Sequence, residues 1–399
     1  MIVLVFNSGS SSLKYRIYDM PEEKLLANGL VERIGLEGGK LIHKYGDKEH
    51  VIEQEIPDHG VAIELVVAAI TDPEHGVVKD LSEIQAAGHR VVHGGEKFSA
   101  SALVDDDVIK AIEEYSEMAP LHNPPNLKGI MACQDKMPGV PNVAVFDTSF
   151  HQSMPDYAYM YAIPYKFYEK YKIRRYGFHG TSHRYVTHRT AEMLDRPMRH
   201  LELVSCHLGN GSSICAIKYG RSIDTSLGFG TISGIPMGTR TGDIDPCVIT
   251  YLQRKLELDR ESLDELIYKQ SGLKGVSGYS DMRDVEEHAL LHERLPALAM
   301  RIMAYSTRKY IGAYAVAMGH LDAIVFTAGI GENDALLRSL VLSDMEFLGV
   351  EIDELANQSV VRGQEAVISK PDSRVKVLVV PTNEELMIAR DTCELVANG

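Results

Sequence analysis

The chain opens on a strand, a tight polar loop and a second strand: Ile2-Val-Leu-Val-Phe6, Asn7-Ser-Gly-Ser-Ser-Ser12 and Leu13-Lys-Tyr-Arg-Ile17. The first run is continuously apolar, as expected of a strand buried on both faces, and the third alternates apolar and polar residues with the period of a half-buried strand. The opening residues therefore predict a hairpin at the start of an α/β fold.

The same order of segments returns about half the chain later. Leu203–Leu208 is an apolar run, Gly209–Ser213 is a Gly/Ser loop, and Ile214–Tyr219 has the pattern of a second strand. We align Gly9-Ser-Ser11 with Gly211-Ser-Ser213. A unit repeated at this spacing predicts two related α/β domains, with a Gly/Ser loop from each facing one cleft.

The two loops are candidate phosphate-binding loops. They are not P-loops, because a Walker A motif opens a helix, whereas each of these loops runs into a strand. Glycine lets backbone N–H groups approach an anion, serine hydroxyls donate hydrogen bonds, and Lys14 would add a positive charge. Ordinary hairpin turns favour the same residue types, but two matching loops favour phosphate binding.

Composition excludes several classes of protein. The chain has 399 residues, 41 Lys and Arg, 56 Asp and Glu, a formal net charge of −15 and 45% hydrophobic residues. The length predicts two or three domains, and the negative charge argues against general attraction to nucleic acid or anionic lipid. No apolar run approaches the ~20 residues of a membrane span. Five cysteines without C-x-x-C spacing, and no leader pattern, predict a cytoplasmic protein with reduced thiols.

Two segments of the second half have the pattern of nucleotide and metal sites. Asp322–Ala328 is typical of a buried strand, and the glycine-rich Gly329–Asn333 follows where a helix would begin, which suits a nucleotide. Glycine in an ordinary strand-to-helix turn is an equal alternative. Near the C-terminus, Thr382 and Glu385 have the spacing of a capping box. Glu384 has no capping role in that pattern and is a candidate Mg²⁺ ligand.

Residues 170–191 contain no acid and are rich in Arg, Lys and His, which predicts an anion-binding face in so acidic a chain. The residues concerned are Lys172, Arg174, Arg175, Arg184, Arg189, His179, His183 and His188. Only His179 and His183 have the i, i+4 spacing of a helical zinc motif, and no C-x-x-C or nearby acid completes a zinc shell. We expect the histidines to form hydrogen bonds.

Two arginines and one aspartate stand where α/β enzymes place functional groups. Arg90 lies in GHRVVHGG and Arg240 in MGTRTGDID, and each could present its planar guanidinium to a carboxylate or phosphate or bridge to Asp or Glu. Asp147 follows the predicted strand Pro141–Phe146, at the carboxyl end where catalytic groups are often found. Simple helix capping is an equal alternative for Asp147.

The chain resembles the acetate kinase family in motifs that follow that family's order and spacing from Ile2 to about Arg390: NSGSSSLK, GHRVVHGG, LHNPPN, VAVFDTSFHQ, RRYGFHGTSHRYV, HLGNGSS, DTSLGFG, MGTRTGDIDP, TAGIGEN and PTNEELMIA. The resemblance implies two duplicated ribonuclease H-like α/β domains with a nucleotide-binding cleft between them. Residues 1–148 would form the N-terminal domain, completed by a C-terminal helix at about 385–399. Residues 149–384 would form the C-terminal domain, with the nucleotide site and the dimer interface.

The resemblance also implies the reaction: reversible, Mg²⁺-dependent transfer of a phosphoryl group between ATP and acetate, giving acetyl phosphate and ADP by direct in-line transfer. Mn²⁺ could replace Mg²⁺. The partners would be ATP, ADP and acetate, with no nucleic acid or membrane, and the protein would be a cytoplasmic homodimer. The alternatives are a propionate or short-chain fatty acid kinase of the same family and a pyrophosphate-dependent acetate kinase.

The family's site residues carry over motif by motif. The catalytic set is Asp147, His179, Arg240 and Arg90. Asn7 and Glu384 would organise the metal. The substrate set is Arg90, Val92, Leu121, His122 and Phe178. The nucleotide set is Lys14, Ser10, Ser12, His207, Leu208, Gly209, Asn210, Gly211, Asp281, Met282, Arg283, Gly329, Ile330, Gly331, Glu332 and Asn333. Because acetate is already ionised at pH 7, we expect Asp147 to orient an arginine or metal-bound water more than it moves a proton.

One segment departs from the family pattern. Where many acetate kinases have G-F-T-P-L-E-G, this chain has Gly228-Phe-Gly-Thr-Ile-Ser-Gly234, so Thr231 replaces a proline of the acyl pocket. Val92 is bulkier than the alanine often found in propionate-preferring relatives and would shorten that pocket. A methylene group is worth about 1–3 kcal/mol in such a pocket, so we expect acetate to be the better substrate and propionate the slower one.

The competing classes each lack a feature of this chain. A pyrophosphate-dependent relative would need an obstructed adenosine pocket, whereas Gly329 and Ile330 keep it open. A non-catalytic ATPase module of the actin or chaperone type would lack the FDTSFH and RRYGFHGTSH segments. A sugar or polyol kinase would need a polar pocket in place of Val92, Leu121 and Phe178.

Overall fold

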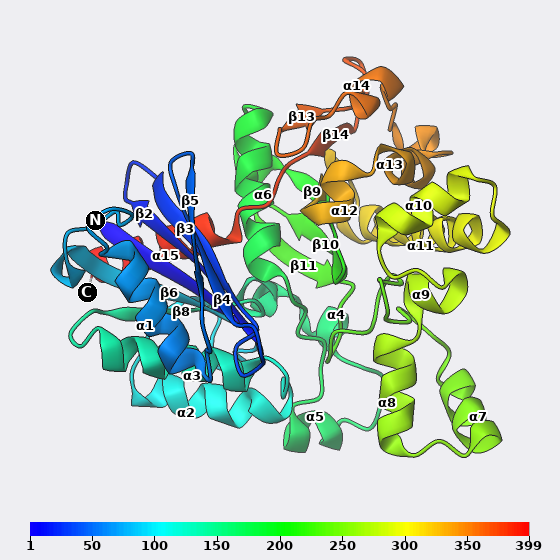
Figure 1. The fold of residues 1–399 in the computed structure, drawn as a ribbon. Helices are drawn as coiled ribbons and strands as arrows, with labels where there is room; N and C mark the ends of the chain where they lie inside the picture. The colour runs from blue at the N-terminus through cyan, green and yellow to red at the C-terminus, as the bar shows by residue number, and fades with distance from the viewer. Residues whose placement is uncertain (399) are drawn as a thin grey trace. The chain divides into compact units, whose positions relative to one another are not determined.

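A computed structural model describes residues 1–398, and the chain divides into two compact units (Figure 1). Unit 1 contains Met1–Phe150 and the chain from Asn383 onward, and unit 2 contains His151–Thr382. Each unit has one β-sheet with helices packed on it. The predicted α/β fold class is confirmed.

Unit 1 is built on an eight-stranded sheet of order β5-β4-β3-β2-β1-β6-β8-β7. Its strands are β1 (Ile2–Ser8), β2 (Ser12–Asp19), β3 (Lys24–Glu32), β4 (Lys40–Tyr45), β5 (Lys48–Glu53), β6 (Ile84–Val91), β7 (Ala102–Leu103) and β8 (Asn142–Phe146). Its helices are α1 (His59–Ile70), α2 (Asp106–Glu114), α3 (Asn123–Lys136) and α15 (Glu384–Asn398). The hairpin of β1 and β2 is the one that the opening residues predict.

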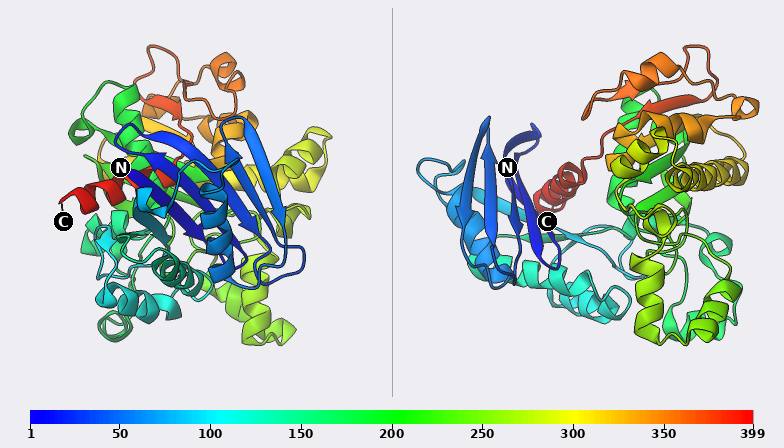
Figure 2. Two further views of the ribbon diagram at one scale, coloured as in Figure 1. Left: turned by 60° about the vertical axis from the view of Figure 1, so that its left-hand side comes forward. Right: turned by 45° about the vertical axis from the view of Figure 1, so that its right-hand side comes forward.

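Side-chain alternation along β1 gives unit 1 its layers. Leu4 and Phe6 belong to an apolar cluster that includes residues of α1 and α3. Helix α15 packs on β1, β6 and β8 from the other face, and it can be followed in red along these strands in Figure 2. Gly88 on β6 marks the closest approach, because a Cβ there would collide with Ile388 and Thr392 of α15. A glycine is therefore required where the last helix crosses the sheet.

The start of α15 differs from its prediction. Asn383 caps the helix, because its Oδ1 accepts a hydrogen bond from the Leu386 N–H at 3.1 Å. Glu385 lies 3.6 Å from Arg16 instead of folding back on the helix end. The predicted capping box of Thr382 and Glu385 is therefore wrong, since Thr382 lies one residue too early to cap a helix that begins at Glu384.

Unit 2 is built on a six-stranded sheet of order β11-β10-β9-β12-β14-β13. Its strands are β9 (Glu202–Leu208), β10 (Ser212–Lys218), β11 (Arg221–Thr225), β12 (Ala323–Thr327), β13 (Ala366–Val367) and β14 (Lys376–Val379). Its helices are α4 (Asp156–Tyr159), α5 (Lys166–Tyr171), α6 (Gly180–Met193), α7 (Pro246–Leu256), α8 (Arg260–Lys269), α9 (Gly272–Ser277), α10 (Met282–Leu290), α11 (Arg294–Met318), α12 (Ala328–Asn333), α13 (Ala335–Leu342) and α14 (Glu354–Gln358). Among residues 1–398, no helix combines the length and apolar character that crossing a membrane requires.

The central strands of the two sheets share one topology. In unit 1, β1, β2 and β3 form an antiparallel meander, β6 pairs parallel with β1, and β8 pairs parallel with β6. In unit 2, β9, β10 and β11 form the same meander, and β12 and β14 take the two parallel positions. The repeat that the sequence predicts is therefore present as a shared ribonuclease H-like strand order.

The proposed alignment of the two loops, however, does not match the hairpins. In unit 1, β1 ends at Ser8 and β2 begins at Ser12, which leaves three residues in the turn, beginning with Gly9. In unit 2, β9 ends at Leu208 and β10 begins at Ser212, which leaves three. Aligning Gly9 with Gly211 is therefore wrong, because it matches the first residue of one turn with the last residue of the other.

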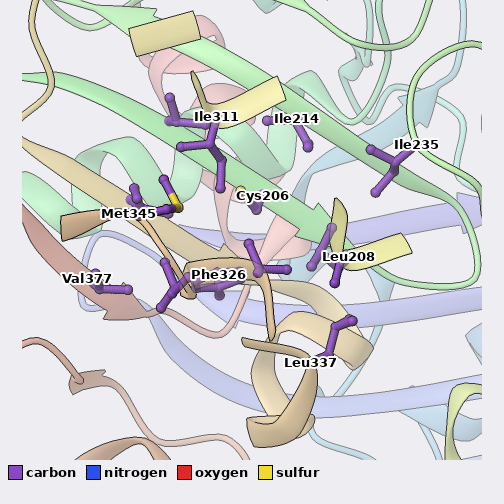
Figure 3. Close-up of a cluster of buried hydrophobic side chains, with 14 of the residues drawn as sticks. Cys206, Leu208, Ile214, Ile235, Ile311, Phe326, Leu337, Met345 and Val377 are labelled. Carbon is purple, nitrogen blue, oxygen red and sulfur yellow. The ribbon is translucent and has the colours of Figure 1, made fainter. Parts of the chain in front are cut away.

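Strands β9 and β10 present different chemistry on their two faces. Cys206 and Leu208 point into a large apolar cluster formed with α11, α13 and β12 (Figure 3). Ser205, His207 and Ser213 alternate with them and lie on the opposite face, which α6 covers; Figure 1 shows α6 and α11 on opposite sides of these strands. The polar groups of unit 2 are thus concentrated under α6.

Candidate active site

An ion pair between Arg90 and Asp147 forms the centre of the candidate site in unit 1. Arg90 lies near the end of β6 and Asp147 directly after β8, and these strands are parallel neighbours. Arg90 Nη2 lies 2.5 Å from Asp147 Oδ2, and Nε lies 3.1 Å from both carboxylate oxygens. Burial opposes the charge on Arg90, but Asp147 and then Glu384 raise the pKa of its guanidinium above the usual value. The bridge to an aspartate that the sequence left open is therefore present.

Two oxygen atoms that could bind a metal ion lie next to the guanidinium of Arg90. Arg90 Nη1 donates to Asn7 Oδ1 at 3.3 Å, and Nε lies 3.9 Å from Glu384 Oε2. Burial, with added repulsion from Asp147 and Glu385, raises the pKa of Glu384 above the ordinary glutamate range. A divalent cation at this point would relieve that repulsion, so the donor set suits a magnesium ion.

The donor set is too small to hold a metal by itself. Within residues 1–398, no group of three or more His, Cys, Asp or Glu side chains is arranged to bind a metal ion. Mg²⁺ commonly takes one or two protein carboxylates and completes its shell with water and substrate phosphates. The amide oxygen of Asn7 and the carboxylate of Glu384 fit that pattern.

Two buried asparagines of the LHNPPN motif, which the sequence analysis did not single out, fix the backbone of this region. Asn126 accepts a hydrogen bond from the Val92 N–H at 3.1 Å and donates to the Ser8 carbonyl at 2.7 Å. Asn123 accepts from the His93 N–H and donates to the His93 carbonyl, both at 3.0 Å. The motif therefore joins the predicted substrate residue Val92 to the end of β1.

Except for Val92, the remaining predicted residues of unit 1 are more open to solvent. Leu121 is 71% exposed, whereas Val92 is buried. Ser10 and Lys14 are exposed, and Ser12 and His122 are half-buried. The structure thus brings Asn7, Arg90, Asp147 and Glu384 together, and it leaves Leu121 at the surface of its unit. Phe178 belongs to unit 2, where it is buried.

In unit 2, His179 and Arg240 both lie close to Gly211. A Cβ on Gly211 would lie 3.6 Å from His179 Nε2 and 3.7 Å from Arg240 Nη1. His179 precedes α6 in a left-handed backbone conformation (φ 56°), which is uncommon outside glycine. The missing side chain of Gly211 leaves room beside two nitrogen groups of the kind that bind phosphoryl oxygens.

The loop that carries Arg240 is held by the start of α9. The Leu273 N–H donates to the Met237 carbonyl at 2.9 Å, and a Cβ on Gly272 (φ 63°) would collide with the main chain of Arg240. Arg240 Nη1 donates to the Thr231 carbonyl at 3.1 Å. Burial lowers the pKa of the Arg240 guanidinium. An approaching anion would therefore stabilise this positive charge.

The basic segment 170–191 is more structural than its composition predicts. Arg175 Nη1 donates to the main-chain carbonyls of residues 225–227. Arg174 is buried against a tyrosine ring, and Arg189 is paired with two glutamates. The prediction of an anion-binding face is wrong for these three arginines, because carbonyls, a tyrosine ring and two glutamates already occupy their guanidinium groups.

The histidines near α6 form hydrogen bonds, as predicted. His183 lies between two hydroxyls, with Nδ1 2.9 Å from Ser205 Oγ and Nε2 2.7 Å from Ser213 Oγ. Ser213 Oγ also lies 2.9 Å from His179 Nδ1, and the His179 ring stacks on His207 with centroids 4.2 Å apart. Burial, followed by the neighbouring histidines, lowers the pKa of His183 well below its usual value. His183 is therefore neutral.

A pocket of about 630 Å³ lies in unit 2 at the β9–β10 turn. Eight of its lining residues belong to the predicted nucleotide set: Gly209, Asn210, Asp281, Met282, Arg283, Gly329, Ile330 and Asn333. The wall also includes Ser280, Glu286, Asp334 and Arg362, which the sequence analysis did not single out. The other predicted members in this unit, His207, Leu208, Gly211, Gly331 and Glu332, are not part of the wall. The volume lies within the ~300–1,000 Å³ usual for ligand pockets.

The glycine-rich segment after β12 is itself the short helix α12, and a buried arginine closes its end. Arg338 is 1% exposed, and its Nη1 donates at 2.9 Å to the carbonyls of Gly331 and Glu332. Its Nε donates to Asn357 Oδ1 at 2.7 Å. An arginine in a helical pattern predicts an exposed side chain, so this support for the pocket could not be found from the sequence.

A pocket of this size at the β9–β10 turn, whose residue Gly211 lies close to His179 and Arg240, on a duplicated ribonuclease H-like fold, is typical of α/β phosphotransferases. The chain belongs to the acetokinase family, whose model matches residues 2–390.

Individual relatives agree with the family assignment. The chain is 57% identical over 398 residues to an acetate kinase of Thermotoga maritima, with 99% of each chain covered. The crystal structure of Porphyromonas gingivalis acetate kinase matches it with a TM-score of 0.95 and 47% identity, covering 99% of both chains. A propionate kinase from Francisella tularensis matches with a TM-score of 0.91 and 39% identity, covering 98% of this chain and 99% of that one.

One carboxylate in the pocket wall has an unsatisfied oxygen. Asp334 Oδ1 accepts a hydrogen bond from the Leu337 N–H at 2.7 Å, whereas Oδ2 is buried without a partner in the part of the chain that the structure describes. Burial, assisted by Glu286, raises the pKa of Asp334 to about 6. An unfolded aspartate titrates near pH 4. Between these values the folded protein holds a proton that the unfolded chain releases, so the folded state loses stability as pH rises through about 6.

We expect Asp334→Asn to stabilise the nucleotide-free protein in a pH-dependent manner. Asparagine can still cap α13 but carries no charge, so the gain should be near zero at about pH 4 and reach about 1–3 kcal/mol at pH 8. Urea unfolding followed by circular dichroism across that range measures it. Asp259→Asn, at the exposed cap of α8, is the control and should not become more stabilising with pH. A gain from Asp334→Asn that is equal at all pH values contradicts the prediction.

Proposed function

We propose that the protein catalyses the reversible transfer of a phosphoryl group between ATP and acetate, giving acetyl phosphate and ADP. The observation that carries the proposal is that His179 and Arg240 both lie close to Gly211, at the turn whose residues Gly209 and Asn210 line the nucleotide-sized pocket. Membership of the acetokinase family supplies the reaction class.

On the acyl side, Arg90 would bind the carboxylate of acetate. A planar guanidinium suits a carboxylate, and Asp147 holds it in one orientation through Nε and Nη2. Acetate is ionised at pH 7 and needs no base to become a nucleophile. Asp147 therefore serves to orient Arg90, and this role explains why both of its oxygens are engaged by the guanidinium.

On the phosphoryl side, His179 and Arg240 would stabilise the group in transfer. The transition state of phosphoryl transfer spreads negative charge over three oxygens, so catalysis depends on positioned donors. The pocket would bind the nucleoside, with Asn210, Asp281 and Ile330 in its wall. Asn7 Oδ1 and Glu384 would hold Mg²⁺ or Mn²⁺, which, when bound, supplies positive charge to the phosphate oxygens.

Acetate is the proposed acyl substrate, and propionate is the second candidate because one structural relative is a propionate kinase. Thr231, which replaces the family's proline, contributes its backbone carbonyl to Arg240. Any residue, proline included, supplies a carbonyl, so the replacement leaves the anchor of Arg240 intact. The homodimer, the cytoplasmic location and the division of roles between two domains stay predictions from the family resemblance.

The direct test is an acyl phosphate assay. The purified protein is incubated with Mg²⁺, with ATP or pyrophosphate, and with acetate, propionate, butyrate or glycerol, and acyl phosphate is trapped with hydroxylamine. We expect hydroxamate from ATP with acetate, less from propionate, and none without Mg²⁺. Product with pyrophosphate but not ATP would replace the proposed donor, preference for propionate would replace the acyl substrate, and no product with either donor would reject the function.

Filling the space at Gly211 should abolish transfer without unfolding the protein. A Cβ there would lie in ordinary contact with His179 and Arg240 and would occupy the space assigned to the phosphoryl group. We expect Gly211→Ala to lower kcat by about 100-fold or more, as when an oxyanion donor is lost, with an unchanged melting temperature. Gly312→Ala, in α11 with no atom within 4 Å of the new Cβ, is the control. Near-normal kcat in Gly211→Ala contradicts the assignment.

The orienting role of Asp147 makes a separate prediction. Hydrogen bonds to charged groups contribute about 1.5–3 kcal/mol, so Asp147→Asn should lower kcat/KM for acetate by about 10–150-fold while the pH–rate profile keeps its shape. Glu385→Gln, which removes a nearby carboxylate that pairs with Arg16, is the matched control and should have a smaller effect. Loss of one ionisation from the Asp147→Asn profile would instead show that Asp147 transfers a proton.

A further inference from the structure

A chain of four side chains runs from the interior of unit 2 to His179. It begins at Ser205 on β9, passes through His183 on α6 and Ser213 on β10, and ends at His179 Nδ1, with successive distances of 2.9, 2.7 and 2.9 Å. Ser205, His183 and Ser213 are all fully buried. The direction in which each hydrogen points decides which nitrogen of His179 carries a proton.

The fixed end of the chain is the Ser205 hydroxyl. Among residues 1–398, the hydrogen bond of Ser205 Oγ is to His183 Nδ1 alone, and the side chain has no exposed surface. If His183 Nδ1 donated to Ser205, the serine hydrogen would be buried without an acceptor, at a cost of about 1–3 kcal/mol, equivalent to about 5-fold to 150-fold. Ser205 therefore donates, and His183 Nδ1 accepts.

The directions of the other two hydrogen bonds in this series follow from the direction at Ser205. His183 is buried and neutral, so its single proton lies on Nε2, which donates to Ser213 Oγ. The hydroxyl of Ser213 is then left to donate to His179 Nδ1. A neutral His179 that accepts at Nδ1 carries its proton on Nε2, the nitrogen that lies 3.6 Å from the position of a Cβ on Gly211.

We infer that Ser205, His183 and Ser213 are positioning residues that set the tautomer of His179, so that its Nε2 is a hydrogen-bond donor toward the transferring phosphoryl group. The inference rests on the proposed function for the identity of that group, but the tautomer itself does not. The stacked ring of His207 lies against the same imidazole and limits its rotation, so the chain fixes the proton and the stack fixes the plane.

The first test reads the tautomer without turnover. The protein is labelled with ¹⁵N-histidine, and the signal of His179 is identified by its loss in His179→Asn. Long-range ¹H–¹⁵N spectra distinguish a protonated ring nitrogen from an unprotonated one. We expect Nε2 of His179 and Nε2 of His183 to be protonated at pH 7.5. Protonation of a neutral His179 at Nδ1 overturns the inference, whatever reaction the protein catalyses.

The second test removes the fixed end. Ser205→Ala leaves His183 Nδ1 without its hydrogen-bond partner, whichever ring nitrogen of His183 carries the proton. The preference for one tautomer should therefore fall, and His179 should show a mixture of tautomers. Because a tenfold rate change corresponds to only about 1.4 kcal/mol, we expect kcat to fall about threefold to tenfold, with KM for ATP and acetate within about twofold. Unchanged His179 signals and kcat overturn the inference.

A double variant and a matched control separate the chain from general damage. Ser213→Ala cuts the chain beside His179, so Ser205→Ala should have no further effect on kcat in that background. Ser222→Ala removes an equally buried serine 2.8 Å from a different histidine, His151, and should leave the His179 tautomer unchanged. Additive losses, or the same His179 change in Ser222→Ala, would assign the effect to packing and overturn the inference. If Ser213→Ala fails to fold, Ser205→Ala and the wild-type spectrum still decide.

Discussion

Side chains alternate across a β-strand with a period of two, and the site in unit 2 depends on this constraint. On β9 and β10 the alternation sends Cys206 and Leu208 into the apolar cluster and sends Ser205, His207 and Ser213 under α6. A slip of one residue would exchange the two faces, burying hydroxyls among Phe326 and its neighbours and removing the serine partners of His183. The apolar face therefore fixes the register, and the register determines which polar groups meet.

In unit 1, the site depends on where three parallel strands end. Asn7, Arg90 and Asp147 lie at or just past the carboxyl ends of β1, β6 and β8, three strands that run parallel, and such ends meet at one edge of a sheet. Glu384 reaches them from the start of α15. Removing one member of a buried ion pair leaves an uncompensated charge, at a cost of about 3–5 kcal/mol. These groups therefore support one another.

The sequence predicts what depends on local pattern. Strand runs, the repeated hairpin and an aspartate at the end of a strand all appear in the structure, as does the pocket lined by Gly209, Asp281 and Gly329. The family motifs account for most of the residues gathered at the two centres. These features are recoverable because they rest on short-range periodicity and on motifs longer than chance would give.

The parts that failed or were missed depend on partners far apart in the chain. Asn126 supports the site because it bridges Val92 and Ser8. Arg338 does so because it binds the end of α12. The neighbouring sequence of Asn126 or Arg338 does not reveal these partners. Arg175 lies in a segment with the composition of an anion-binding site, but its guanidinium donates hydrogen bonds to main-chain carbonyls. The misplaced capping box is a smaller case, since one residue decides between Thr382 and Asn383.

A chain of net charge −15 that binds a nucleotide must attract the phosphates through groups close to them. Charges beyond about 8–10 Å are largely screened at physiological ionic strength, so the overall charge weakens binding less than the nearest groups strengthen it. Arg90 is already neutralised by Asp147, whereas within residues 1–398 the hydrogen bonds of the Arg240 guanidinium go to the Thr231 carbonyl and the Met237 sulfur, which offset little of its charge. Beside it stands His179, whose Nε2 we infer to be held as a hydrogen-bond donor by Ser205, His183 and Ser213. One unneutralised guanidinium and one fixed N–H can thus favour a phosphoryl group in transfer, because dipoles already in place need no reorganisation when the charge develops.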